Sequence, residues 1–166
     1  MLIATKIQDL NFFKLMEVYI EGNEENGREQ YPNHSAFEQL RLAESDFYHY
    51  LADDFFKQTE AIYFVLTEAD KYISALRVEP YRDGMLLQAL ETRPDMRRLG
   101  FAKMLLSDVL QYLRDNGHKK IYSHISKRNL PSIKIHKACG FDEILDYAEY
   151  IDGTVSSGAV TMCAQI

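Results

Sequence analysis

A change in hydrophobic periodicity near the middle of the chain most limits how the chain can fold. Residues 85–90 form an apolar run typical of a buried strand, and residues 99–116 carry apolar side chains at helical spacing. The basic segment 93–102, which contains Gly100, lies between them. The sequence therefore predicts a strand, a short turn and a long amphipathic helix in direct succession.

A turn of this kind is suited to binding phosphate. The first N–H groups of a helix have no partner within the helix, and its dipole places partial positive charge there. Gly100 allows a ligand to approach the backbone closely, and Arg97 and Arg98 add full charges. An arginine pair on a solvated surface is the alternative interpretation.

The composition excludes several classes of protein. A chain of 166 residues can bury a core as one domain, and we expect residues 1–166 to form one. The net charge of −6 argues against general binding to nucleic acid, because no basic surplus is available to displace counterions. No stretch approaches the roughly 18 apolar residues of a membrane span. With only Cys139 and Cys163 present, we expect a cytoplasmic protein with reduced thiols and no membrane partner.

The N-terminal third is predicted to be mainly helical after a short strand at residues 2–7. Asp9 is the expected N-cap of a first helix. The polar segment 21–30, with its two glycines, predicts a loop or a mobile extension of that helix. Ser35 and Glu38 form a capping box, which predicts the start of a second helix.

The remainder of the chain alternates between strands and helices. Strands are predicted at residues 61–66, 72–78, 85–92, 119–126, 141–151 and 159–164. Helices are predicted at residues 99–116 and 129–140. Because short turns join three strands in succession, we expect an antiparallel meander within one mixed α/β fold.

Two motifs resemble a known family. Arg97-Arg98-Leu99-Gly100-Phe101-Ala102 matches the R/Q-x-x-G-x-G/A signature of the GNAT superfamily of acyl-CoA-dependent N-acetyltransferases. Residues 129–141 resemble the second motif of that family, in which an asparagine opens a helix and Gly-Phe closes it. Both motifs have the family spacing, and the resemblance is clearest from about residue 62 to residue 141.

The resemblance implies the GNAT fold, a mixed and mostly antiparallel twisted sheet of about seven strands flanked by helices. In that fold the fourth and fifth strands part like a V, and the pantetheine arm of acetyl-CoA enters the opening, where it pairs with the fourth strand as an added strand does. The pyrophosphate would lie on the backbone amides of residues 98–103. The residues that the resemblance assigns to the cofactor are Leu90, Thr92, Arg97, Arg98, Leu99, Gly100, Phe101, Ala102, Lys103 and Asn129.

The implied reaction moves an acetyl group from acetyl-CoA to a primary amine of a small molecule or a protein. Such a transfer needs a neutral amine, a donor for the developing oxyanion and a path for the departing thiolate. Glu91 lies where family members often place a carboxylate that acts as a general base through water. Its alternative role is a surface carboxylate paired with Arg93 or Arg97.

His136 departs from the pattern of the family, which commonly has tyrosine at this position facing the sulfur of CoA. A histidine can protonate the departing thiolate, since it titrates near neutral pH. It can also fill space without transferring a proton. For this reason a non-catalytic acyl-CoA-binding sensor on the same scaffold is the alternative function.

The acceptor site is less clearly marked. His124, Tyr147 and Tyr150 fit either an acceptor wall or ordinary strand packing, and the acids of segment 21–30 fit either a cationic amine or a solvated loop. The remaining histidines show no spacing typical of metal ligands, so we expect no metal. Dimers are common in the family, which makes a homodimer possible here.

Overall fold

The computed structural model describes all 166 residues and contains a central sheet of seven strands. Their spatial order is β1-β2-β3-β4-β5-β9-β6, and only β4 and β5 run parallel. The bounds of these strands are β1 Leu2–Ala4, β2 Ile62–Glu68, β3 Lys71–Tyr81, β4 Gly84–Thr92, β5 Lys120–Ser126, β6 Asp142–Leu145 and β9 Ala159–Gln165. Two short strands, β7 Ala148–Glu149 and β8 Val155–Ser156, form a separate pair. The mixed, mostly antiparallel sheet confirms the predicted fold.

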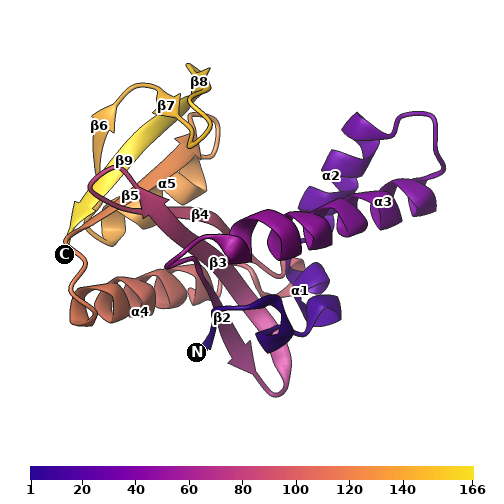
Figure 1. The fold of residues 1–166 in the computed structure, drawn as a ribbon, viewed down its shortest axis with the longest axis horizontal. Helices are drawn as coiled ribbons and strands as arrows, with labels where there is room; N and C mark the ends of the chain where they lie inside the picture. Colours follow the sequence, from indigo (N-terminus) through magenta and orange to yellow (C-terminus); the bar gives the residue numbers. More distant parts are fainter.

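Five α-helices accompany the sheet (Figure 1). They are α1 Phe12–Val18, α2 Ile20–Gln30, α3 Ala36–His49, α4 Phe101–Asp115 and α5 Leu130–Ala138. The buried leucines of α4 pack against Leu76 and Leu87 on one face of the sheet. On the opposite face, α1 packs against Tyr63 and Ala75, and the pair α2–α3 extends away from the sheet. The two cores therefore lie on opposite faces of β2 and β3.

The long helix predicted at residues 99–116 is α4. Its apolar face is fully or almost fully buried, through Leu105, Leu106, Val109, Leu110 and Leu113. The helix begins after Gly100, whose φ of +88° lies in the left-handed region that favours glycine. The turn and the helix start are thus fixed by the same residue.

Two predictions for the N-terminal helices need correction. The side chain that caps α1 belongs to Asn11, which accepts a hydrogen bond from the N–H of Lys14, whereas Asp9 ends a preceding 3₁₀ turn. Of the two alternatives for residues 21–30, the loop is wrong and the helical extension is closer, because these residues lie within α2, which begins two residues after the end of α1. Gly27 allows this helix to approach α3 so closely that an added Cβ would be 2.5 Å from the carbonyl oxygen of Gln39. Tertiary packing outweighs the poor local helix propensity of the segment.

Other boundaries differ at the strands. The first strand ends at Ala4 rather than residue 7, and the strand predicted at residues 141–151 is divided into β6 and β7. The pairing of β6 with β9 shifts register between Glu143 and Leu145, which ends the regular ladder. The capping box of Ser35 and Glu38 is confirmed at the start of α3. None of the helices has the length and apolar character needed to cross a bilayer.

Candidate active site

The two parallel strands separate soon after they begin to pair. Residues 85–87 of β4 pair with residues 121–123 of β5, after which β5 continues beside β9 and β4 beside β3. The N–H of Arg93 donates to the carbonyl oxygen of Ile73 on β3. Because backbone groups alternate along a strand, those of Leu90 and Thr92 are directed away from β3, toward the side of β5. This arrangement leaves a V-shaped opening whose wall is the free edge of β4.

A bulge in β4 stands at this opening. The register between β3 and β4 shifts near Ala89, which has a φ of +52°, an uncommon value for alanine. The hydroxyl of Tyr19 donates to the carbonyl oxygen of Ala89 at 2.8 Å, and the hydroxyl of Tyr63 donates to the oxygen of Tyr19 at 2.8 Å. Burial raises the pKa of Tyr19 well above its ordinary value and that of Tyr63 to about 12, so both stay protonated donors. No sequence signal identified the bulge or these tyrosines.

The turn between β4 and α4 presents unpaired backbone donors. The N–H groups of residues 98–103 donate no hydrogen bond within the protein. Arg98 and Gly100 both have positive φ values, +65° and +88°, and no atom lies within 4 Å of a Cβ placed at Gly100. A run of free amides at a helix N-terminus is a type of group that binds phosphate, and the pyrophosphate was predicted to bind at these residues.

Arg97 is held beside this turn by two hydrogen bonds and one longer ion pair. Its Nε donates to the carbonyl oxygen of Thr92 at 3.1 Å, and its Nη1 lies 2.6 Å from Oε2 of Glu21. Its Nη2 lies 3.7 Å from Oε2 of Glu91. In contrast, Arg98 is exposed and forms no ion pair, so its full charge is available beside the free amides.

Glu91, the predicted general base, is at the end of β4. Its side chain is 47% exposed, and burial of the remainder raises the pKa of its carboxyl group, while the Arg97 guanidinium opposes the rise. A carboxylate with a raised pKa that still reaches solvent can accept a proton through water. The structure shows the alternative role directly, because this carboxylate is an ion-pair partner of Arg97.

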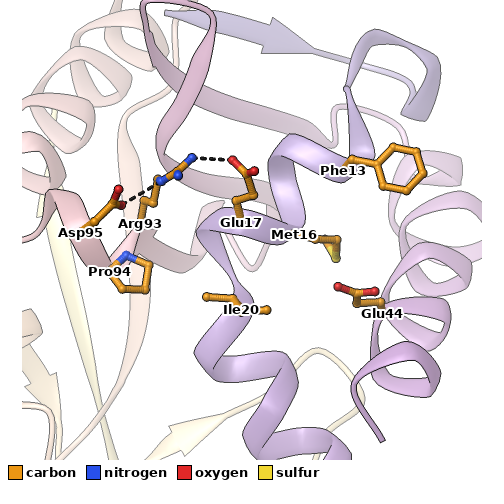
Figure 2. A pocket seen from close by; sticks show the side chains of 8 residues that line it. All are labelled: Phe13, Met16, Glu17, Ile20, Glu44, Arg93, Pro94 and Asp95. Atoms are coloured by element: carbon orange, nitrogen blue, oxygen red, sulfur yellow. Dashed lines mark hydrogen bonds and ion pairs between the residues drawn. The ribbon is translucent and has the colours of Figure 1, made fainter. Parts of the chain in front are cut away.

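A cavity of about 350 Å³ lies between the N-terminal helices and the first residues of the β4–α4 turn. Figure 2 shows Arg93 between Asp95 and Glu17, with Met16 and Ile20 of the α1–α2 segment beside it. Arg93 forms ion pairs with both carboxylates, which neutralise its charge and connect the end of β4 to α1. The acids of the N-terminal helices thus hold the β4–α4 turn in place.

His136 is buried on α5, with only 1% of the residue exposed. Its Nδ1 must carry a proton, because it donates to the carbonyl oxygen of Ser132 at 2.9 Å. Its Nε2 then accepts from the hydroxyl of Ser123 on β5 at 3.2 Å. Burial lowers the pKa of the imidazole, although the hydrogen bond to Ser132 opposes this change. Both ring nitrogens are therefore already engaged within the protein.

The other predicted site residues lie around the opening or beyond it. Asn129 is exposed at the N-cap of α5, where Oδ1 accepts from the N–H of Ser132 and the amide nitrogen forms no hydrogen bond with the protein. His124 is stacked edge-on between Tyr81 and Tyr150, and neither of its buried ring nitrogens has a partner. The backbone of Tyr147 accepts a hydrogen bond from Thr161 on β9.

The fold and the V-shaped site define an acyltransferase of the GNAT type, and the comparison of sequences agrees. Residues 24–141 match the acetyltransferase (GNAT) family, so the chain belongs to this family. No curated protein matches the chain significantly.

Solved structures of this family share the fold at low sequence identity. The PaiA N-acetyltransferase from Thermoplasma acidophilum, solved in complex with coenzyme A, aligns with a TM-score of 0.65 and 12% identity over 99% of this chain and 98% of its own. The ribosomal-protein-S18-alanine N-acetyltransferase from Escherichia coli aligns with a TM-score of 0.55 and 21% identity over 74% and 76% of the two chains. A GNAT acetyltransferase from Elizabethkingia anophelis with acetyl-CoA bound has a TM-score of 0.57 and 12% identity over 69% and 80%.

Proposed function

We propose that the protein is an acetyl-CoA-dependent N-acetyltransferase that acetylates a primary amine by direct attack in a ternary complex. The observation that carries this assignment is the free edge of β4 beside the unpaired amides of residues 98–103. The coenzyme A and acetyl-CoA bound in the relatives from Thermoplasma acidophilum and Elizabethkingia anophelis support the same donor.

The donor would be held by backbone groups more than by side chains. The amides of residues 98–103 and the guanidinium of Arg98 would bind the pyrophosphate. The pantetheine arm would pair with the backbone of Leu90 and Thr92 as an added strand does, sharing the Thr92 carbonyl oxygen with Nε of Arg97. Asn129, at the N-cap of α5, has a free amide nitrogen with which to contact this arm.

In the reaction, the amine nitrogen attacks the thioester carbonyl while a backbone N–H of β4 near Thr92 donates to the developing oxyanion. The C–N bond forms, the C–S bond breaks and the electron pair of that bond leaves on the sulfur. Glu91 accepts the proton of the amine through water, since its raised pKa makes it a stronger base than an ordinary glutamate.

His136 has two proposed roles toward the departing thiolate. As an acid it would have to act through Ser123, whose hydroxyl occupies its Nε2. As a packing residue it would hold α5 against β5 without transferring a proton. The engagement of both ring nitrogens favours the second role.

The test is release of free CoA thiol from acetyl-CoA over a panel of primary amines. We expect amine-dependent turnover and an acetylated product detectable by mass spectrometry. Gly100→Val should weaken CoA binding strongly in calorimetry, because valine disfavours a φ of +88° and would add bulk beside the free amides. Tight CoA binding without turnover on any amine would instead identify a non-catalytic acyl-CoA sensor.

A further inference from the structure

A second cavity lies beside the bulge in β4, on the sheet face opposite α4. It has a volume of about 340 Å³ and is lined by residues of the N-terminal helices and of β3 and β4. The lining residues that matter here are Tyr19, Asn23, Asn26, Tyr50, Arg77 and Ala89. A cavity of this size is within the range of small-molecule sites.

Arg77 is the only charged residue in this lining. Its Nη2 donates to the side-chain oxygen of Gln88 at 3.0 Å, whereas its Nε is buried without a partner and it forms no ion pair. The buried carboxylate of Glu79, two residues further along β3, attracts the guanidinium without forming an ion pair with it, and accepts a hydrogen bond from Gln58 at 2.6 Å. The guanidinium carbon is 5.0 Å from the centroid of the Tyr50 ring, which only partly offsets the loss of water.

The lining favours a ligand group that is planar and carries one negative charge. A guanidinium presents its donors as a fork that matches a carboxylate. The nearby side chains Asn23, Asn26 and Tyr50 are neutral at physiological pH, so the cavity carries one positive charge and lacks the further cations that a dianionic phosphate would need.

The cavity also has a defined position relative to the chemistry. Ala89 forms part of its wall, and the next residue, Leu90, directs its backbone toward the V-shaped opening. Arg77 pairs across the strands with Gln88, next to the bulge. A small ligand can therefore contact Arg77 at one end and present its other end at the edge of β4.

We propose that the acceptor is a small amine that carries a carboxylate, and that Arg77 binds this carboxylate inside the cavity. The assignment rests on the N-acetyltransferase function proposed above and narrows the acceptor from any primary amine to amino acids and similar compounds. An internal lysine of a protein does not meet this requirement, since its side-chain amine is not attached to a carboxylate that could enter the cavity.

The experiment compares each of a set of amino acids with its own carboxamide as an acceptor of acetyl-CoA. The wild-type protein should show a kcat/KM about 10- to 100-fold higher for the carboxylate than for the carboxamide, the range expected for hydrogen bonds to a charged group. In Arg77→Met, which keeps an aliphatic side chain, this ratio should fall to about one through a raised KM for the carboxylate. Arg77→Lys should retain an intermediate ratio, because it keeps the charge without the fork.

Arg41→Met is the matched control, because Arg41 is an exposed arginine of α3 paired with Glu44 outside the cavity. Unchanged thermal unfolding and CoA affinity in Arg77→Met would show that the variant is folded. If wild type acetylates carboxamides as well as carboxylates, the role of Arg77 is overturned while the acetyltransferase function stands.

If no amine is acetylated, the proposed function fails. The role of Arg77 is then tested by measuring ligand binding instead of turnover. N-acetyl amino acids, titrated into the CoA-loaded protein, should then bind to wild type and not to Arg77→Met, and the N-acetyl carboxamides should bind to neither. Equal binding of both compounds to both proteins would reject the carboxylate site.

Discussion

Nη1 of Arg97 lies 2.6 Å from Oε2 of Glu21, which joins the turn before α4 to the first turn of α2. Both side chains are partly exposed, at 39% and 56%. Helix α2 also borders the cavity of Arg77, so this ion pair connects the expected pyrophosphate site with the expected acceptor site.

Replacing Glu21 by glutamine should strengthen CoA binding. The carboxylate competes with the pyrophosphate for Arg97, and exposed ion pairs are worth about 0.2–1 kcal/mol, so the Kd should fall by up to about fivefold. Calorimetric titration with CoA at low and high salt measures the change, which should shrink as salt rises. Glu25→Gln, on the same helix and without an ion pair, is the control; a similar gain in that variant would show only a general charge effect.

Replacing Glu91 by glutamine should reduce kcat/KM by about 10²- to 10⁴-fold at neutral pH, the usual range for a general base. The wild-type rate should rise with pH as Glu91 loses its proton, with a midpoint above that of an ordinary glutamate because burial raises its pKa. In Arg97→Gln that midpoint should move to still higher pH, since the guanidinium lowers the pKa of Glu91. Rates at saturating CoA measure these shifts. Glu68→Gln, exposed at the end of β2, should be neutral, and an unchanged profile in Glu91→Gln would exclude the base role.

Replacing His136 by phenylalanine separates its two proposed roles. If the residue only packs, kcat should fall by a similar factor at every pH, because the shape of the profile does not depend on the imidazole. The measurement is kcat from pH 5.5 to 9.5 with a saturating amine. Loss of the alkaline limb of the profile would instead assign the proton of the thiolate to His136 and Ser123.

The stability of the protein should fall in mild acid partly because of His136. Its pKa is lowered in the folded state, so the unfolded chain binds the proton more readily as the pH drops below about 6.5. The stabilisation is present above that pH and is lost toward the lower folded pKa, with a slope of at most about 1.4 kcal/mol per pH unit. Urea unfolding between pH 5 and 8 should show a shallower slope in His136→Gln than in the wild type. His34→Gln, at an exposed loop position, serves as the control.

Two glycines in α2 should respond oppositely to alanine. An added Cβ at Gly27 would be 2.5 Å from the carbonyl oxygen of Gln39, so Gly27→Ala should lower the free energy of unfolding by about 1–3 kcal/mol. No atom lies within 4 Å of a Cβ placed at Gly22. Gly22→Ala should therefore raise the free energy of unfolding by about 0.5–1 kcal/mol through helix propensity. Chemical denaturation of both variants measures the difference. Equal effects at the two positions would contradict the close contact between α2 and α3.

Local sequence patterns identified the helices whose formation depends mainly on their own residues. The apolar face of α4 and the capping box at Ser35 could be found in the sequence because each is a local pattern. Residues 21–30 lacked such a pattern, yet they form α2, which approaches α3 closely at Gly27. Helix propensity could not predict the contact between Gly27 and Gln39, because the two residues lie in different helices.

The sequence by itself determined most strands of the sheet, helices α4 and α5, the turn from Arg97 to Ala102 and, through two motifs, the family. These features are local, because a glycine, a charge or a cap acts within a few residues. Only the tertiary structure brought Tyr19 to Ala89, engaged both nitrogens of His136 and left Nε of Arg77 buried without a hydrogen-bond partner. Those properties depend on which side chains meet across strands and helices, and burial and charge pairing are set by these distant neighbours.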